Sequence, residues 1–353
     1  MLGRYRLSGF RNLCAVDVEW HPTCSIVYGQ NASGKTSLLE GVHVLARGRS
    51  FRTTGLDRLV TVGAKGFTAY GEVQRGDQRV RVGVAREAGT TRARIDGRDA
   101  TGLSELAWQL PVQVVNTESQ RLLQDGPAGR RSFLNWTVFH VEHGYHAAWR
   151  RADRGLRQRN AALRAGQVRL ARSLEGEFVA AAERVDRMRA AVVARLAPAV
   201  REQLQGWLPG VEVEIRYRRG WARDRALADV LTGQRDSELR QGFTLAGPQR
   251  ADLRITVGGR DAVDVLSRGQ QKLVVIALLL GQSALFYASS GTPPIALVDD
   301  LPAELDADAR RLVLDGLLDG TRQCLLTAID PDALPVAEAR WFHVEQGRVS
   351  KVL

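Results

Sequence analysis

Gly29-Gln30-Asn31-Ala32-Ser33-Gly34-Lys35-Thr36 is the stretch of sequence that decides the fold of this chain. Its residues match the phosphate-binding loop pattern G-x-x-x-x-G-K-[ST], and Ser37 follows directly. The apolar run at 25–28 predicts a strand before the loop, and residues 37–45 predict a helix after it. The loop therefore has the strand-loop-helix setting that the pattern requires, and we expect it to bind a nucleotide.

Each part of the loop has a role in phosphate chemistry. Glycines let backbone N–H groups turn toward phosphate oxygens, and the helix that follows directs the positive end of its dipole at them. Lys35 is expected to neutralise oxygens of the β- and γ-phosphates, and the Thr36 hydroxyl is expected to bind Mg²⁺. We therefore predict that residues 29–37 bind ATP with Mg²⁺. A chance match to the pattern is the alternative.

Two adjacent carboxylates end a short apolar run near the end of the chain. Ile295–Val298 predicts a buried strand, and Asp299 and Asp300 follow it. A carboxylate at that position can hold Mg²⁺ through a water molecule beside the Thr36 hydroxyl, which is the role we predict for Asp299. Asp300 is then the candidate catalytic base that positions the attacking water, with Lys35 as the second catalytic residue. Two carboxylates that only cap the next helix are the alternative.

The second motif is Leu266-Ser267-Arg268-Gly269-Gln270-Gln271, which resembles the signature of the ABC-type ATPases. Ser267 has the position of an N-cap residue before a long apolar helix, so Ser267, Gly269 and Gln270 are expected at the positive end of a helix dipole. This helix end has no phosphate of its own to bind, so the phosphate must come from elsewhere. A two-fold dimer would bring the γ-phosphate on one subunit's loop to the other subunit's signature helix. An ordinary capped helix is the alternative.

The composition predicts a soluble, cytoplasmic protein. The chain has 353 residues, 44% of them apolar and 25% charged, and no apolar run approaches the roughly 20 residues of a membrane span. A signal peptide is not recognisable at its start. Three cysteines without a metal-ligand pattern argue against a disulfide framework or a structural zinc site.

The net charge of +11 favours a polyanionic partner. Much of the surplus positive charge lies at residues 150–201, which include 13 arginines and five acidic residues. This region is predicted to be a contact surface for a phosphate backbone, or else only a solvated helical surface.

The pattern along the chain predicts an α/β ATPase head with mixed sheets that is interrupted by helices. Residues 1–132 are expected to form its N-terminal part with an antiparallel sheet, residues 133–205 a basic helical insertion, and residues 206–353 its C-terminal part. A break near Arg172–Glu175 would give two helices that fold back as an arm. The helical lobe would thus be inserted between the phosphate loop and the signature motif.

Further motifs make the sequence resemble the RecF family of bacterial recombination mediators, relatives of the structural-maintenance-of-chromosomes (SMC) ATPase heads. The resemblance extends over essentially the whole chain. Besides the ATPase motifs, it is carried by Phe10-Arg11-Asn12, Gln124-Asp125-Gly126-Pro127, Arg130-Arg131-Ser132-Phe133-Leu134 and Gly247-Pro248-Gln249-Arg250-Ala251-Asp252-Leu253.

This resemblance implies an ABC-type ATPase fold and an ATP-dependent homodimer. It implies binding to single-stranded DNA and to gapped duplex DNA, recombinase loading, replication-fork maintenance, DNA repair and SOS induction, with RecR and RecO as partners. It also implies that Arg11 approaches the nucleotide and that Glu304-Leu305-Asp306 communicates across the dimer. ATP hydrolysis would be weak, stimulated by DNA and used as a switch.

The sequence departs from related heads at several positions. Glu118 stands where relatives carry a glutamine, Gln249 replaces a histidine, Asp300 is one methylene shorter than a glutamate, and Thr327-Ala328-Ile329-Asp330 lacks the histidine of transporters. Two alternatives stay open at this point. They are a P-loop ATPase coupled to a nuclease or other second enzymatic step, and the ATPase subunit of a transporter.

Overall fold

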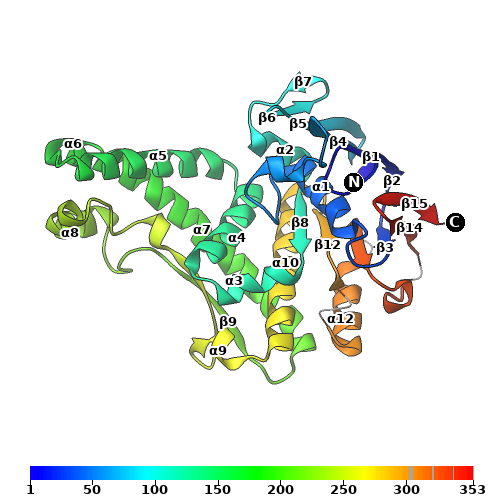
Figure 1. The fold of residues 1–353 in the computed structure, drawn as a ribbon. Coiled ribbons are helices and arrows are strands. Elements are labelled where there is room, and N and C mark those ends of the chain that lie inside the picture. The colour runs from blue at the N-terminus through cyan, green and yellow to red at the C-terminus, as the bar shows by residue number, and fades with distance from the viewer. Residues whose placement is uncertain (302–304, 320–321, 337, 353) are drawn as a thin grey trace. The chain divides into compact units, whose positions relative to one another are not determined.

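The structure is a computed structural model that describes residues 1–301, 305–319, 322–336 and 338–352 (Figure 1). The chain forms two compact units. One consists of residues 1–119 together with 286–353, and the other of residues 120–285. These limits differ from the segments 1–132, 133–205 and 206–353 expected from the sequence. The first unit contains both ends of the chain.

The first unit contains a six-stranded antiparallel sheet with the order β2-β1-β4-β5-β6-β7. Its two long strands alternate buried and more exposed side chains, as a sheet with one covered face requires. They are joined by a two-residue turn in which Gly76 has a φ of 55°. The strands are β1 (Leu2–Ser8), β2 (Val16–Glu19), β4 (Gly66–Arg75), β5 (Gln78–Glu87), β6 (Thr90–Ile95) and β7 (Arg98–Asp99).

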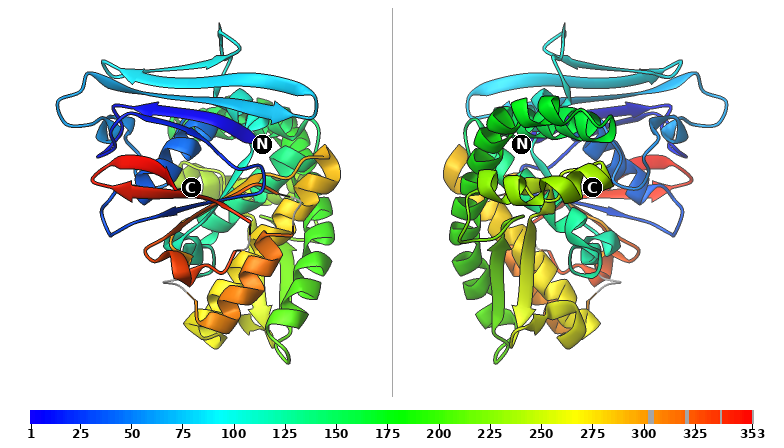
Figure 2. Two further views of the ribbon diagram at one scale, coloured as in Figure 1. Left: turned by 90° about the vertical axis from the view of Figure 1, so that its right-hand side faces the viewer. Right: turned by 90° about the vertical axis from the view of Figure 1, so that its left-hand side faces the viewer.

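The second sheet of this unit has the order β15-β14-β3-β13-β12-β8 and is parallel except for β15. Its strands are β3 (Cys24–Tyr28), β8 (Val112–Val115), β12 (Ile295–Val298), β13 (Cys324–Ala328), β14 (Arg340–Glu345) and β15 (Arg348–Val352). β12 and β13 are buried along their whole length, as parallel strands covered on both faces are. In Figure 2, strands β4 and β5 lie in a layer separate from that of the red hairpin β14–β15.

Helix α1 (Lys35–Arg47) contacts β4 and β5 of one sheet and β13 of the other. Leu38, Leu39, Val42 and Leu45 are fully buried in the core that the two sheets share. This unit also contains the shorter helices α2 (Leu103–Gln109) and α12 (Ala307–Leu317). The core therefore fixes the start of α1 against the ends of the parallel strands.

The second unit is largely helical. Its elements are α3 (Arg121–Gln124), α4 (Pro127–Val141), α5 (Tyr145–Arg164), α6 (Val168–Ser173), α7 (Glu175–Trp207), α8 (Leu227–Gln241), α9 (Ala262–Val265), the strands β9 (Val213–Arg218), β10 (Asp252–Val257) and β11 (Arg260–Asp261), and the start of α10 (Arg268–Ser290). α7 runs back along α5, because Arg159 pairs with Glu175 and Arg189 with Tyr145 (Figure 1).

The fold-back was predicted, but the helices were not all placed correctly. The expected break at Arg172–Glu175 coincides with the end of α6 and the start of α7. A further break at 165–167 separates α5 from α6, and helix already begins at Pro127 instead of Phe133. Helix α8 was not predicted at all, because its polar residues give only a weak apolar stripe.

α10 is long and apolar enough to cross a membrane by length and composition alone. However, 72% of its most apolar window is buried inside the structure. This burial is that of a core helix of a globular fold.

The three cysteines lead to a first prediction. All are free thiols; Cys14 is exposed, whereas Cys24 and Cys324 are buried on adjacent strands. Burial raises the pKa of Cys24 to about 12, so little reactive thiolate forms there at neutral pH. We expect a thiol reagent to modify one cysteine quickly in the native protein and three after unfolding, as counted by mass spectrometry. Rapid modification of Cys24 in the native protein would contradict this packing.

Candidate nucleotide-binding site

The phosphate-binding loop has the backbone conformation that its glycines predict. Gly29 and Gly34 have φ values of 153° and 123°, and Ala32 has a φ of 63°. A Cβ at Gly29 would lie 2.2 Å from the carbonyl oxygen of Val344, and a Cβ at Gly34 would lie 2.7 Å from Leu13. Close packing against backbone and φ both require glycine at position 29, whereas at position 34 the φ of 123° is the main reason for glycine.

Asn12 holds the loop from the side. Its Nδ2 donates to the carbonyl oxygen of Ala32 at 3.0 Å, and its Oδ1 accepts from the Ser37 hydroxyl at 3.1 Å. The N–H of Gly347 donates to the carbonyl oxygen of Ser33. Asn12 was noted in the sequence only as part of a motif. Asn12 is adjacent in sequence to Arg11, which was predicted to approach the nucleotide. This adjacency was the signal that could have assigned Asn12 to the phosphate-binding loop.

Lys35 lies inside the curl of the loop and is 7% exposed. Its Nζ donates to the carbonyl oxygens of Gly29 and Gln30 at 2.7 and 2.9 Å. Burial lowers the pKa of Lys35, and the carboxylates of Asp300 and Asp299 act in the opposite direction. The ammonium is thus held where the loop closes, close to the acidic pair.

The start of α1 adds positive potential at the same place. Gly34 is the N-cap residue, no side chain among the described residues caps the helix, and its first turn holds no acidic residue. The first N–H groups of the helix therefore keep their capacity to bind an anion.

Asp299, Thr36 and Thr327 form a hydrogen-bonded cluster at the carboxyl ends of the parallel strands. The Thr36 hydroxyl donates to Asp299 Oδ1 at 3.0 Å, and the Thr327 hydroxyl donates to the same oxygen at 2.7 Å. β13, which carries Thr327, lies between β3 and β12, so the sheet order brings together residues 263 positions apart. Ligand sites of open α/β sheets form at this edge.

Asp300 has an uncommon backbone conformation, with a φ of 57°. Its N–H donates to the Thr327 hydroxyl at 2.9 Å, so Thr327 fixes both residues of the acidic pair. Thr327 is fully buried. In the sequence, Thr327 was named only as part of a stretch that lacks the histidine of transporters. The role of Thr327 in positioning the acidic pair was missed.

Arg11 is bound within its own unit. Its guanidinium donates twice to Glu40, with both distances 2.9 Å, and Glu40 is fully buried. An approach of Arg11 to the nucleotide stays a prediction, and in this conformation Glu40 engages two of its nitrogens. Glu304 lies outside the described residues. Asp306 caps α12 by accepting from the N–H of Ala309 at 2.8 Å.

The signature helix starts as the sequence predicts. Ser267 Oγ accepts from the N–H of Gln270 at 3.3 Å, while Gln270 Oε1 accepts from the N–H of Ser267 at 3.0 Å, a reciprocal capping box. Ser267 and Gly269 are exposed, and a Cβ added at Gly269 would meet no described atom within 4 Å. Gln271 is buried and anchors the turn through the carbonyl oxygens of Val263 and Leu266. This helix end is therefore open to a partner.

The intermediate motifs form structural links in the second unit. Arg130 makes two hydrogen bonds to Asp252, and Arg131 donates to the carbonyl oxygen of Ala251. Arg189 donates to the carbonyl oxygen of Pro248 at 2.7 Å. These contacts join α4 and α7 to the first residue of β10 and to the segment that precedes it.

The arginine-rich region 150–201 is only partly a surface. Arg159 is fully buried and bound by Glu238 at 2.6 Å and by Glu175 at 3.0 Å, and Arg189 is 2% exposed. Two of its 13 arginines therefore stabilise the interior, so counting charges in the sequence overstated the positive surface.

A phosphate-binding loop after β3, a carboxylate after β12 and an exposed, capped signature helix on a mixed-sheet fold define an ATPase head of the ABC type. The protein-family model described as the RecF/RecN/SMC N-terminal domain matches residues 1–350. The chain therefore belongs to the RecF/RecN/SMC family.

Individual relatives show that the chain is a member of the RecF group within this family. The DNA replication and repair protein RecF of Chromohalobacter salexigens is 43% identical over 357 residues, covering 99% of each chain. RecF of Stutzerimonas stutzeri is 42% identical, covering 99% of this chain and 97% of the relative.

Solved structures show the same fold. The recombination mediator protein RecF with ATP, from the RecFOR pathway, has a TM-score of 0.89 at 22% identity, covering 100% of this chain and 97% of that one. An SMC head bound to a domain of ScpA has a TM-score of 0.63 at 13% identity, covering 99% of this chain and 97% of that one.

Proposed function

We propose that this protein is an ATP-gated DNA-binding protein of DNA replication and repair. Mg-ATP joins two heads, the joined heads bind DNA, and slow hydrolysis of ATP releases the DNA. The names of the relatives support a role in DNA replication and repair. The solved structure of RecF with ATP supports ATP as the bound nucleotide. The observation that carries the proposal is the hydrogen-bonded cluster of Thr36, Asp299 and Thr327 beside Lys35.

The residues present fit Mg-ATP. Thr36 Oγ1 and Asp299 Oδ1 are 3.0 Å apart, so the hydroxyl could hold Mg²⁺ directly and the carboxylate could hold it through water. The free N–H groups at the start of α1 and the Lys35 ammonium can bind phosphate oxygens. When bound, the ion would neutralise charge on the β- and γ-phosphates. Asp300 would hold the water that attacks the γ-phosphate.

The dimer is proposed because the signature helix has an exposed, capped start. Ser267, Gly269 and Gln270 can donate to the γ-phosphate bound by a second copy. If ATP binds the dimer better than the monomer, ATP tightens dimerisation and dimerisation tightens ATP binding by the same factor.

The DNA substrates and partners extend the proposal. We include in the proposal binding to single-stranded and gapped duplex DNA, recombinase loading with RecR and RecO, replication-fork maintenance, SOS induction and a cytoplasmic location. Their support is the resemblance to the RecF family. The solved RecF structures belong to the RecFOR pathway, which supports RecR and RecO as partners.

Ser267→Arg tests the dimer. The arginine side chain would occupy the space needed by a neighbour's γ-phosphate, while loss of the cap costs only about 1 kcal/mol of stability. We expect the variant to bind ATP as a monomer and to show no ATP-dependent increase in mass in analytical ultracentrifugation.

Ser173→Arg is the matched control. Ser173 is also an exposed hydroxyl at a helix end in the second unit, bonded to the carbonyl oxygen of Leu170. This variant should dimerise with ATP like the unchanged protein. A wild-type mass that is the same with and without saturating Mg-ATP would refute the proposed gating.

A further inference from the structure

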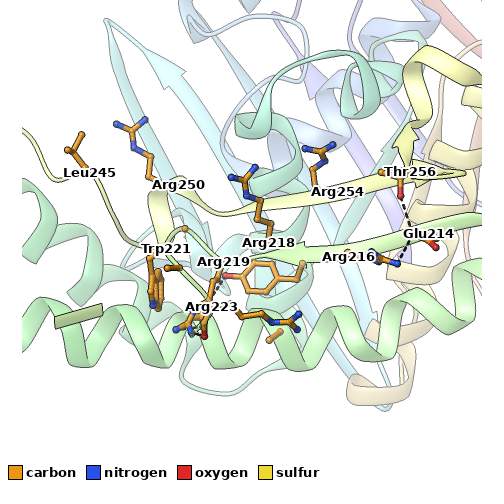
Figure 3. A pocket seen from close by; sticks show the side chains of 16 residues that line it. Glu214, Arg216, Arg218, Arg219, Trp221, Arg223, Leu245, Arg250, Arg254 and Thr256 are labelled. Carbon is orange, nitrogen blue, oxygen red and sulfur yellow. Dashed lines mark hydrogen bonds and ion pairs between the residues drawn. The ribbon is translucent and has the colours of Figure 1, made fainter. Parts of the chain in front are cut away.

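A hollow surface in the second unit gathers six arginines. It follows β9, the segment after it, and β10, and its volume is about 1070 Å³. Asp186 and Glu214 are the acidic residues that line it. We call it the arginine trough; its arginines are Arg216, Arg218, Arg219, Arg223, Arg250 and Arg254 (Figure 3).

Carboxylates neutralise only half of these arginines. Arg219 pairs with Asp186 at 3.2 Å, Arg216 with Glu214 at 2.9 Å and Arg254 with Asp261 at 2.6 Å. The other three, which are Arg218, Arg223 and Arg250, have no carboxylate within 4.0 Å in the described parts of the chain. All three are exposed. The trough therefore keeps positive charge that can bind an anion.

The strand register concentrates this charge on one face. Arg216 on β9 lies directly opposite Arg254 on β10, and Arg218 follows two residues along the same face. Like charges at opposed positions of an antiparallel pair destabilise a sheet. Figure 3 shows Arg250, Arg218 and Arg254 extending toward the same side. Glu214 and Asp261 offset the charge of Arg216 and Arg254, whereas the charge of Arg218 and Arg250 is left for a polyanion that crosses the row.

The aromatic residues of the trough offer little surface for stacking bases. Trp221 is 8% exposed, and the Arg219 guanidinium lies 3.9 Å from the centre of its ring. The Tyr217 hydroxyl donates to Asp186 at 2.9 Å. Recognition of unpaired bases depends on open aromatic platforms. The trough is therefore suited to phosphates and not to bases.

We propose that the arginine trough binds the phosphate backbone of duplex DNA without reading its sequence. This inference rests on the proposed DNA-binding function and gives it a location. It places the contact on β9, the segment after it and the residues just before β10, instead of on the arginine-rich helical region 150–201. Arg218, Arg223 and Arg250 carry the binding, because their charge is not already neutralised by the protein.

The test compares two triple variants that each remove three exposed arginines. One is R218Q/R223Q/R250Q in the trough, and the control is R150Q/R154Q/R172Q in the region 150–201. Binding to a labelled duplex is measured with ATP at several salt concentrations. Losing three phosphate contacts should weaken binding at least about tenfold and lower the slope of log K against log salt by roughly 2 to 3. The control should change both values much less.

Several outcomes separate the possibilities. If the trough variant keeps wild-type affinity and salt slope, the proposal is wrong. It is also wrong if the control variant, and not the trough variant, loses DNA affinity. A wild-type protein that binds no DNA would overturn the proposed function itself. Unchanged ATP-dependent mass and melting temperature show that the trough variant is folded. R218K/R223K/R250K, which keeps the charge, should restore most of the affinity; if it does not, charge is not what the trough supplies.

Discussion

Lys35→Ala is expected to abolish ATP binding at micromolar nucleotide concentrations. The ammonium lies at the closed end of the loop, where only a compact cation fits among Gly29, Gln30 and the acidic pair. A charged hydrogen bond contributes about 1.5–3 kcal/mol, so losing two such bonds to phosphate weakens binding by roughly 100-fold or more. Isothermal titration calorimetry with a non-hydrolysable ATP analogue measures this directly.

The variant must be shown to fold, because Lys35 also bonds the loop to itself. Removing it leaves the carbonyl oxygens of Gly29 and Gln30 without this donor, at a cost of about 1 kcal/mol for each bond. The melting temperature should therefore fall by only a few degrees. Lys35→Arg should not restore binding, since a guanidinium is larger than the enclosed space around an ammonium that is 7% exposed. Nucleotide affinity that survives in both variants would rule out the assigned role of the loop.

Asp300→Asn is expected to preserve ATP binding and to slow hydrolysis by roughly 10²–10⁴-fold, the usual contribution of a general base. The substitution keeps the shape of the side chain. It also suits the backbone, because asparagine tolerates the positive φ of 57° at this position. The ATP-bound dimer should then persist on DNA. Single-turnover hydrolysis and the rate of release from a labelled duplex measure the two effects.

Asp299→Asn provides the contrast. Asp299 accepts hydrogen bonds from Thr36 and Thr327 and is the proposed ligand of Mg²⁺, so its neutralisation should reduce the magnesium dependence of ATP binding. Asp300→Asn should leave that dependence unchanged. Equal losses of nucleotide affinity in both variants would show that the two carboxylates share one role, against the division proposed between them.

The sequence predicted the fold well where the chemistry requires particular residues. Lys35, Thr36 and Asp299 were placed together from their motifs, and the structure brings Thr36 and Asp299 into hydrogen bonding. Strand β12 was predicted with its correct limits, Ile295–Val298, because a buried parallel strand is a continuous apolar run. The capping of the signature helix by Ser267 was also confirmed.

Other features depend on contacts between distant residues, which local patterns do not contain. The role of Thr327 follows from the position of β13 between β3 and β12. The burial of Arg159 depends on Glu238, 79 residues away. The arginine trough exists because β9 and β10 pair with Arg216 opposite Arg254. In each case the residue type was visible in the sequence, but its neighbours were set by strand order and register.

The position of β3 in its sheet has a consequence for synthesis of the protein. This strand leads into the phosphate-binding loop near the start of the chain, yet both strands beside it, β13 and β14, come from residues 324–345. During translation, β3 lacks its neighbours in this sheet until residues 324–345 have left the ribosome. Its apolar surface is a target for chaperones during that interval, and a ribosome that stops early releases a product unable to assemble this sheet.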